Sequence, residues 1–356
     1  MTKKSTLMQT TTSKTVDQNR APEPRQAPGT APETQHGLGA TTDDKCRICE
    51  SRLDGAVIVD TGDLRVQRCN TCGAGMLVPL PSDEMLAEGY QSGDYAQEKG
   101  RLSGWLGRIL APLYRHRVDF ATAQGTKTGR LVEIGSGKGR LLHMAKSMGI
   151  DARGVEPHGS RREHGADEFD LDIYAGTLEE FVGEGENYDM VTMWHVLEHV
   201  PRPVEFLGEV AKVMADDARL TIEVPNVDTW ARKSCGVAWQ GWQFPVHLTH
   251  FTPGSLRFGL DAAGLEVIEL STWSPQMSVL GWTQSILNRF TRTENLLYRI
   301  LKRNWSPRTR DDYADIGRLG LACVVLALAS PLVVAATFLE RRVDAGPVVR
   351  VACRKR

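Results

Sequence analysis

The sequence predicts an α/β fold in which helices cover both faces of a parallel sheet. From Arg130 onward, short apolar runs with strand character alternate with helix-like segments, and a glycine-rich loop joins the first strand to the first helix. Composition agrees with this fold class, because 41% hydrophobic and 24% charged residues among 356 are typical of a globular chain. A chain that is disordered or fibrous throughout is therefore excluded.

The expected elements follow from apolar periodicity and from the positions of proline and glycine. Pro203 opens one helix, and Gly264 ends another directly before a strand. Strands are expected at 131–134, 152–155, 189–194, 219–224, 265–270 and 348–351. Helices are expected at 102–120, 141–148, 178–181, 203–214 and 256–263.

Shifts in composition divide the chain into six parts. The first residues are rich in Thr, Gln, Pro and Ser and hold almost no large apolar side chain, so we expect them to be disordered. The parts are a disordered tail at 1–43, a cysteine-rich module at 44–81, a helical lid or linker at 82–128, the main α/β domain at 129–270, a basic and hydrophobic insertion at 271–345, and a final strand at 346–356.

Overall charge and the N-terminus bear on partners and compartment. Forty-three Lys and Arg against 44 Asp and Glu give a net charge of −1, so a protein that mainly coats nucleic acid is not expected. No apolar segment follows Lys3 and Lys4, so no secretory signal is visible. The chemistry is expected on the cytoplasmic side.

Four of the seven cysteines form two CxxC pairs, Cys46 with Cys49 and Cys69 with Cys72. Nineteen residues separate the pairs, which is the spacing of two knuckles that close one tetrahedral zinc site. Gly73 follows the second pair and allows the tight turn that such a knuckle needs. We therefore predict one structural Zn²⁺ held by four thiolates.

The glycine loop predicts a cofactor. Gly135, Gly137 and Gly139 lie between a strand and a helix, where backbone can approach a ligand closely. The spacing is GxGxG rather than the GxGxxG of dinucleotide sites, and Glu133 precedes it. Glu156 ends the next strand, where a carboxylate can accept both hydroxyls of a ribose. This combination indicates S-adenosylmethionine.

These motifs resemble a known family. Residues 133–139, Glu156 and the run 188–201 resemble class I S-adenosylmethionine-dependent methyltransferases, in the family that includes ubiquinone-biosynthesis O-methyltransferases and sugar-tailoring methyltransferases. Members with an N-terminal two-CxxC module resemble residues 45–80 as well. The resemblance implies a Rossmann-like sheet, methyl transfer as the activity, and a cofactor edge that includes Ser136, Trp194 and His195.

The sequence His195-x-x-Glu198-His199 follows a predicted strand and has several interpretations. HxxEH is also an inverted zinc-protease signature, but Pro201 and Pro203 exclude the long helix that it requires. The resemblance implies a divalent-metal site of ExxEH type here, in which His195 replaces the first acid. His199 or His195 is otherwise a general base or an acceptor-orienting residue, because imidazole titrates near neutral pH, or else a structural histidine.

A second histidine-containing segment follows Pro245. His247 and His250 lie close in sequence to Trp239 and Trp242, and aromatic rings beside histidines suit a sugar or ring acceptor. The alternative is a packed loop with hydrogen-bonded histidines. The resemblance favours His247 as the catalytic base of this segment.

The insertion combines a basic and an apolar segment. Residues 286–310 hold seven Arg and Lys and one acid, and residues 319–339 carry no charge. Twenty-one uncharged residues suffice for one bilayer crossing, but the strand at 348–351 must return to the sheet beside 265–270. We expect Pro331 to break the helix into two short arms, which gives an interfacial hairpin on an anionic membrane surface. A buried helix within the fold is the alternative.

The expected function is methyl transfer from S-adenosylmethionine to a hydroxyl or carbon of a sugar, a lipid-linked glycan or another hydrophobic acceptor at the cytoplasmic face of the membrane. A quinone- or polyketide-type O-methyltransferase is the alternative within the same class, and a non-catalytic membrane scaffold is the alternative outside it. No Asn/Asp-Pro-Pro-aromatic tetrapeptide follows Asp189, so base amines of nucleic acid are not expected as acceptors.

Overall fold

The computed structural model describes residues 44–91, 105–124, 129–159, 169–301, 307 and 309–356. The expected disordered tail at 1–43 lies outside the described residues, as do parts of the linker and of the basic segment.

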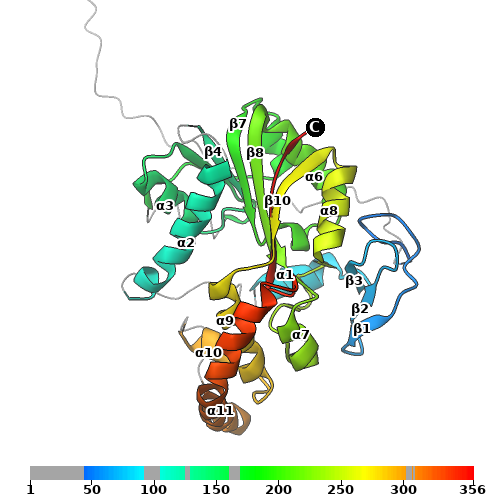
Figure 1. Ribbon diagram of the computed structural model, residues 1–356, viewed down its shortest axis with the longest axis vertical. Coiled ribbons are helices and arrows are strands. Elements are labelled where there is room, and N and C mark those ends of the chain that lie inside the picture. Colours follow the sequence, from blue (N-terminus) through cyan, green and yellow to red (C-terminus); the bar gives the residue numbers. More distant parts are fainter. Residues whose placement is uncertain (1–43, 92–104, 125–128, 160–168, 302–306, 308) are drawn as a thin grey trace, which may run out of the picture. The chain divides into compact units, whose positions relative to one another are not determined.

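The main domain is built on a seven-stranded sheet with the order β10-β11-β8-β7-β4-β5-β6 (Figure 1). Its strands are β4 (Leu131–Ile134), β5 (Ala152–Val155), β6 (Ile173–Tyr174), β7 (Tyr188–Trp194), β8 (Met214–Pro225), β10 (Leu265–Ser271) and β11 (Val348–Lys355). β11 runs antiparallel to both of its neighbours, and the other pairs are parallel. The predicted α/β fold and the return of the last strand beside β10 are thereby confirmed.

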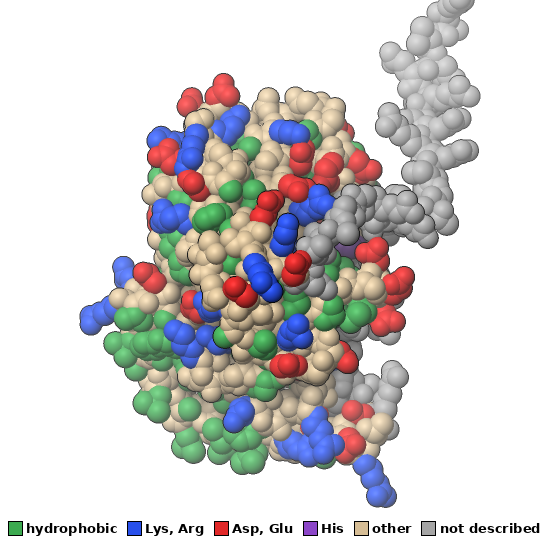
Figure 2. Space-filling view, turned by 90° about the vertical axis from the view of Figure 1, so that its right-hand side faces the viewer, with side chains coloured by type: hydrophobic (Ala, Val, Ile, Leu, Met, Phe, Trp, Pro, Cys, Tyr) green, Lys and Arg blue, Asp and Glu red, His purple; other side chains and the backbone are tan. Residues whose placement is uncertain are grey.

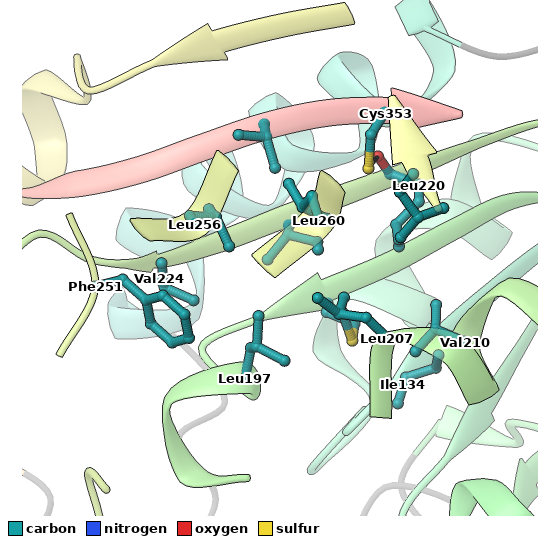
Figure 3. Close-up of a cluster of buried hydrophobic side chains, with 14 of the residues drawn as sticks. Ile134, Leu197, Leu207, Val210, Leu220, Val224, Phe251, Leu256, Leu260 and Cys353 are labelled. Atoms are coloured by element: carbon teal, nitrogen blue, oxygen red, sulfur yellow. Dashed lines mark hydrogen bonds between the residues drawn. The ribbon is translucent and has the colours of Figure 1, made fainter. Parts of the chain in front are cut away.

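Helices cover both faces of this sheet. The helices of the domain are α2 (Trp105–Gln124), α3 (Arg140–Ser147), α5 (Leu178–Val182), α6 (Pro203–Lys212), α7 (Trp230–Cys235) and α8 (Pro253–Ala262), with short 3₁₀ turns η2 (Leu197–His199) and η3 (Gly236–Ala238). Val118 of α2 packs with Leu131 and Met190 on one face. On the other face the side chains of α6 and α8 pack on β7 and β8, as the buried cluster of Figure 3 shows.

The cysteine-rich module forms a second, four-stranded sheet in the order β1-β2-β3-β9. Its first three strands are β1 (Val57–Asp60), β2 (Arg65–Arg68) and β3 (Gly75–Val78), and helix α1 (Asp83–Gln91) follows them. The fourth strand, β9 (Thr249–His250), comes from the loop region of the main domain. The second sheet therefore includes a segment that is distant in sequence from the cysteines.

The insertion forms α9 (Pro275–Asn288), α10 (Leu296–Leu301) and α11 (Arg310–Glu340) at the lower end of the molecule in Figure 1. The predicted break at Pro331 is wrong, because α11 is one helix of 31 residues that contains this proline. Asp315 near its beginning accepts hydrogen bonds from the amides of Arg292 and Thr293, and Glu340 at its end bonds to α9. With both ends held, loss of the single N–H of proline does not separate two arms.

Candidate active site

The glycine loop between β4 and α3 leaves space at one position. Gly135, Gly137 and Gly139 all have positive φ, a conformation that side chains other than glycine rarely adopt. A Cβ at Gly135 would collide with Val196, and one at Gly139 would collide with Leu171. A Cβ at Gly137 would meet no atom within 4 Å, so this glycine faces the space above the sheet edge.

Glu156 lies beside that space at the end of β5 and is 3% exposed. Its Oε2 accepts the Gly137 amide hydrogen at 2.8 Å, and its Oε1 accepts the His158 amide hydrogen at 3.1 Å. Each carboxylate oxygen can accept a second hydrogen bond. The carboxylate is thus fixed by backbone while it retains the capacity to accept two ribose hydroxyls.

Three further polar atoms around this edge are buried without a hydrogen-bond partner among the described residues: Glu133 Oε2, Ser136 Oγ and Trp194 Nε1. Burial raises the pKa of Glu133 to about 8, and the charge of Glu156 adds to this effect while that of Arg117 opposes it. Buried polar atoms are normally paired, so a set of unpaired ones around an open space indicates a polar ligand. The edge therefore fits the amino-acid and nucleoside groups of S-adenosylmethionine.

His195 follows β7 and has a φ of +58°, which is strained for a residue other than glycine. Its Nδ1 lies 3.3 Å from Glu198 Oε1, and its Nε2 lies 3.2 Å from Glu223 Oε1. Burial alone would disfavour its charged form, but the two carboxylates outweigh this effect and raise the pKa of His195 to about 9. At neutral pH this imidazole is a cation and cannot accept a proton.

Glu223 belongs to a buried ion cluster that sequence reasoning missed. Arg117 of α2 donates to its Oε1 at 2.7 Å, and Arg350 of β11 donates from Nε to its Oε2 at 2.8 Å. Although burial opposes ionisation, Arg117, His195 and Arg350 hold the pKa of Glu223 well below its usual range. The sequence around Arg117 and around Arg350 does not indicate this cluster, because only folding brings these side chains from α2 and β11 to Glu223 on β8.

Glu198, His199 and His247 form a second cluster, in which one ligand atom of each lies within 4.8 Å of the others. Glu198 is 1% exposed, and neither carboxylate oxygen meets hydrogen-bond geometry with a described residue. His199 Nδ1 is 2.9 Å from the Val246 carbonyl oxygen, and His247 Nδ1 is 3.0 Å from that of Gly241.

Both histidines of this cluster are neutral at physiological pH, because burial lowers the pKa of each to about 3. A neutral imidazole with its Nδ1 hydrogen on a backbone carbonyl is the form in which histidine ligates metals. The structure thus groups Glu198 and His199 with His247, whereas the sequence suggested His195 as the third member.

The tryptophans near His247 are packed rather than presented to an acceptor. Trp239 and Trp242 are 4% and 3% exposed and belong to a hydrophobic cluster with Leu248. This agrees with the alternative of a packed loop. The aromatic ring beside the cluster is that of Tyr90 in α1, whose centroid lies 5.9 Å from that of His199 and 5.1 Å from that of His158.

The four predicted zinc ligands lie together. Cys46 Sγ is 3.5 Å from Cys72 Sγ, and Cys49 Sγ is 3.5 Å from Cys69 Sγ. A tetrahedral site with Zn–S bonds of 2.3 Å needs sulfur separations of about 3.8 Å, so the cluster fits Zn²⁺. The residue after each pair has positive φ, Gly73 as predicted and Glu50 in the first knuckle.

Comparisons with known proteins find sequence similarity to methyltransferases. Residues 106–270 match a family described as "Methyltransferase domain". The ubiquinone biosynthesis O-methyltransferase of Azorhizobium caulinodans is 29% identical over 181 residues, which are 47% of this chain and 70% of that protein. The enzyme of the same name from Aeromonas salmonicida is 29% identical over 170 residues, 44% of this chain and 71% of that one.

Among solved structures, the cyclopropane synthase MmaA2 of Mycobacterium tuberculosis gives a TM-score of 0.47 at 14% identity, over 78% of this chain and 100% of that one. A SAM-dependent methyltransferase from Archaeoglobus fulgidus gives 0.44 at 15% identity, over 69% and 94%.

Proposed function

We propose that this chain, whose residues 106–270 match a methyltransferase-domain family, transfers a methyl group from S-adenosylmethionine to a hydroxyl group of a hydrophobic acceptor at a membrane surface. The observation that carries the proposal is the cluster of Glu198, His199 and His247 beside a complete cofactor edge. A hydroxyl acceptor needs a nearby group that assists removal of its proton, because this proton must leave as the methyl group arrives.

Glu198, His199 and His247 would hold a divalent cation, in line with one ligand atom of each lying within 4.8 Å of the others in the protein interior. Such a cation would lower the pKa of an acceptor hydroxyl bound to it. Without a cation, His247 or His199 would accept the proton directly, although imidazoles with a pKa of about 3 are weak bases. The donor set therefore favours metal-assisted deprotonation.

The other residues of the site bind and orient. Glu156 and the glycine loop hold the nucleoside, and Glu133 lies buried beneath the loop, near the sheet edge. His195 is held between two carboxylates and keeps the chain at the end of β7 in its strained turn. Methyl transfer is an in-line displacement, so fixed placement of cofactor and acceptor away from water supplies most of the acceleration.

The membrane part of the proposal rests on α11. Among the described residues this is the helix long and apolar enough to cross a membrane, and little of its apolar stretch is buried. Leu328 and Leu332 are 78% and 74% exposed. Figure 2 shows hydrophobic side chains gathered at the lower end of the molecule, with basic side chains beside them. Contiguous apolar surface of this kind marks an interaction site.

The placement of α11 favours a position along the bilayer surface. Glu340 accepts hydrogen bonds from Ser278 and from Trp282, at 3.0 and 2.9 Å, so the end of α11 is fixed to α9. If α9 and α11 crossed together as a hairpin, the basic segment between them would be translocated, against the rule that basic loops stay inside. Basic side chains on anionic headgroups and apolar ones below them fit an interfacial helix.

The acceptor class follows from two considerations. The matched relatives are named as acting in ubiquinone biosynthesis, which favours a prenylated ring hydroxyl, the alternative that the sequence left open. A lipid-linked glycan remains the second candidate, since it also combines hydroxyls with a long apolar tail.

Incubation with methyl-labelled S-adenosylmethionine and a bacterial lipid extract separates the two candidates. Label in neutral prenyl-phenols supports the ring hydroxyl, and label in acid-labile glycolipids supports the lipid-linked glycan. Label bound to carbon would contradict O-methylation.

Membrane binding is tested by flotation with vesicles. Leu328→Asp combined with Leu332→Asp should abolish binding to vesicles that contain anionic lipid, while the Kd for S-adenosylmethionine stays unchanged. Ile268→Asp is the matched control, because Ile268 is 46% exposed on β10, outside the insertion. Equal binding of all three proteins, or binding that ignores lipid charge, would contradict an interfacial role for α11.

A further inference from the structure

The zinc module and the acceptor cluster share one β-sheet. β3 of the module pairs antiparallel with β9, with Gly75 opposite His250 and Met76 opposite Thr249. β9 begins two residues after His247, a member of the acceptor cluster. β3 is therefore paired with the segment that directly follows His247.

One residue, Leu248, joins the module to the cluster directly. The Leu248 amide donates to the Glu198 carbonyl oxygen at 2.8 Å, and the Leu248 carbonyl accepts from the Leu77 amide at 2.9 Å. The guanidinium of Arg47 also donates to the Leu248 carbonyl, and to that of Leu77 at 3.3 Å. A hydrogen-bonded path thus runs from Arg47 through Leu248 to Glu198.

Arg47 belongs to the first zinc knuckle, between Cys46 and Cys49. The knuckle turn is closed by the Glu50 amide, which donates to the Cys46 carbonyl at 2.9 Å. Cys46 and Cys49 would both be metal ligands. Bound metal would therefore fix the backbone that orients the Arg47 guanidinium.

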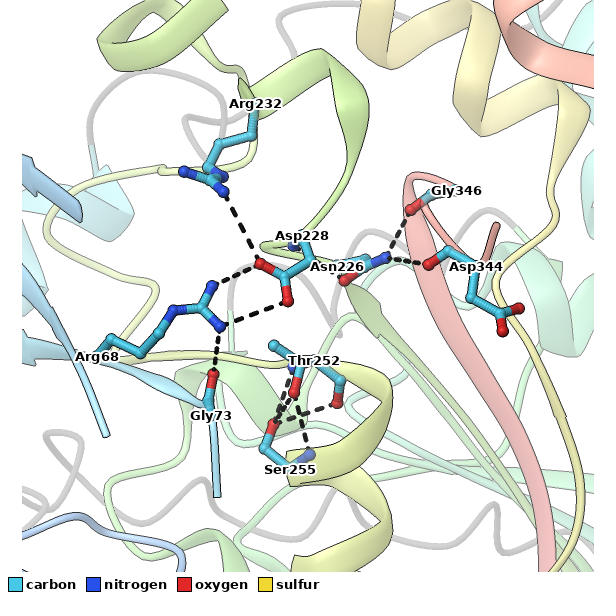
Figure 4. Close-up of polar contacts among 9 residues, drawn as sticks. All are labelled: Arg68, Gly73, Asn226, Asp228, Arg232, Thr252, Ser255, Asp344 and Gly346. Carbon is cyan, nitrogen blue, oxygen red and sulfur yellow. Dashed lines mark hydrogen bonds and ion pairs between the residues drawn. The ribbon is translucent and has the colours of Figure 1, made fainter. Parts of the chain in front are cut away.

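The second knuckle has its own connection (Figure 4). Arg68 pairs with Asp228 through both carboxylate oxygens and donates to the Gly73 carbonyl, directly after Cys72. Asn226, two residues before Asp228, donates to the Gly346 carbonyl at 2.8 Å, where the chain enters β11. Each knuckle is therefore bonded to a segment at the acceptor side of the sheet.

From these contacts we infer that the zinc module is a positioning element of the acceptor site, in which Arg47 holds the Leu248 peptide and thereby sets His247 against Glu198. Metal loss from the module loosens the acceptor cluster and leaves the cofactor edge intact, because the contacts described above lead from the module to β9 and Asp228, whereas Glu156 is held by the glycine loop itself. The inference uses the proposed function only for what the cluster does, not for how it is held.

Hydrogen exchange on the full-length protein tests this directly and needs no acceptor. Chelation of zinc, or Arg47→Ala, should accelerate exchange at the amides of Leu248 to His250 by about tenfold, as expected for loss of a hydrogen bond from a charged donor. Amides of 131–156 and the Kd for S-adenosylmethionine should not change, and readdition of Zn²⁺ should reverse the effect of chelation.

Two variants make the result specific. Arg65→Ala removes an exposed arginine from β2 of the same module and should leave exchange at 248–250 as in the parent protein. Arg47→Lys keeps the charge without the forked donor and should give a partial effect, with zinc content equal to that of the parent. Once an acceptor is known, Arg47→Ala should lower kcat without changing the cofactor Kd.

Unchanged exchange at 248–250 after zinc loss and in Arg47→Ala would overturn the inference and leave the proposed methyl transfer untouched. Acceleration throughout the main domain would also overturn it, because the module would then stabilise the whole fold rather than position one segment. If exchange behaves as expected but methyl transfer fails in every variant, including Arg65→Ala, the result would count against the proposed acceptor chemistry alone.

Discussion

The two halves of the proposed active site are built differently. The cofactor half lies within residues 131–158 and consists of a strand, a glycine loop, a helix and the carboxylate that ends the next strand. The acceptor half is assembled from η2, the loop before β9, α1 and two zinc knuckles, which are up to 200 residues apart in the chain. A short stretch of sequence can form a site that binds its ligand through backbone groups. The residues of the proton-accepting cluster, by contrast, are brought together only by the tertiary fold.

The largest expected effect is a loss of cofactor binding that leaves the acceptor half unchanged. Gly137→Val should abolish measurable binding of S-adenosylmethionine, because it places a branched side chain in the open space of the loop and at a φ of +55°. Calorimetry measures the binding. Gly149→Val is the matched control, since Gly149 also has positive φ and an open Cβ position but follows α3. Equal loss in both variants would attribute the effect to backbone strain.

The difference between the halves explains what could be predicted from the sequence. Gly135, Gly137 and Glu156 could be assigned because a strand, a tight turn and a second strand fix their relative positions over about twenty residues. The grouping of the four cysteines could also be predicted, since each CxxC pair forms its own hydrogen-bonded turn. In both motifs the information is contained in short stretches of chain.

The next effect concerns the acceptor half. His247→Ala or Glu198→Gln should slow methyl transfer by about 10²–10⁴-fold, because the acceptor proton then has no route to leave. The Kd for S-adenosylmethionine should stay within twofold of the parent value. His250→Gln is the comparison variant, since His250 is as buried as His247 but lies outside the cluster of three donors. A comparable loss in His250→Gln would indicate general disruption of this loop.

Features set by long-range packing were not predicted from the sequence. Glu223 reads as one polar residue in a β-branched strand, yet it pairs with Arg117 and Arg350, which lie more than 100 residues away in either direction. A break in α11 was predicted at Pro331 because proline inside a helix is locally unfavourable. The contacts of Asp315 and Glu340 at the helix ends outweigh that cost, and the helix is continuous. Contacts of this kind appear only when the sheet order is known.

A smaller effect is expected from the carboxylate that holds the ribose. Glu156→Ala should weaken binding of S-adenosylmethionine by about 2–4 kcal/mol, since two hydrogen bonds to a charged group are lost and water replaces part of them. Glu156→Gln should give an intermediate loss, because an amide oxygen still accepts but carries no charge. Zinc content and exchange at Leu248 should be unaffected in both. An unchanged Kd for Glu156→Ala would show that another group binds the ribose.

The effect that is smallest per unit of change is a pH dependence, which belongs to the cofactor half. Glu133 is 6% exposed with one oxygen unpaired, and burial raises its pKa to about 8, with Glu156 adding to the shift and Arg117 opposing it. In the unfolded chain it titrates near 4.5, so between these values the folded protein holds the proton that the unfolded chain has released. The free energy of unfolding without cofactor should therefore fall as pH rises through this window, by up to about 1.4 kcal/mol per pH unit.

S-adenosylmethionine carries a sulfonium and an ammonium group, and both favour an ionised carboxylate beside them. Its affinity should therefore rise up to about tenfold per pH unit between pH 6 and 8 and level off above the pKa of Glu133. Glu133→Gln should flatten this profile, because the amide does not titrate. Calorimetry in buffers of different ionisation enthalpy measures the proton released on binding, which should be lost in Glu133→Gln. A parent protein that releases no proton at pH 7 would show that the cationic groups of the cofactor lie away from Glu133.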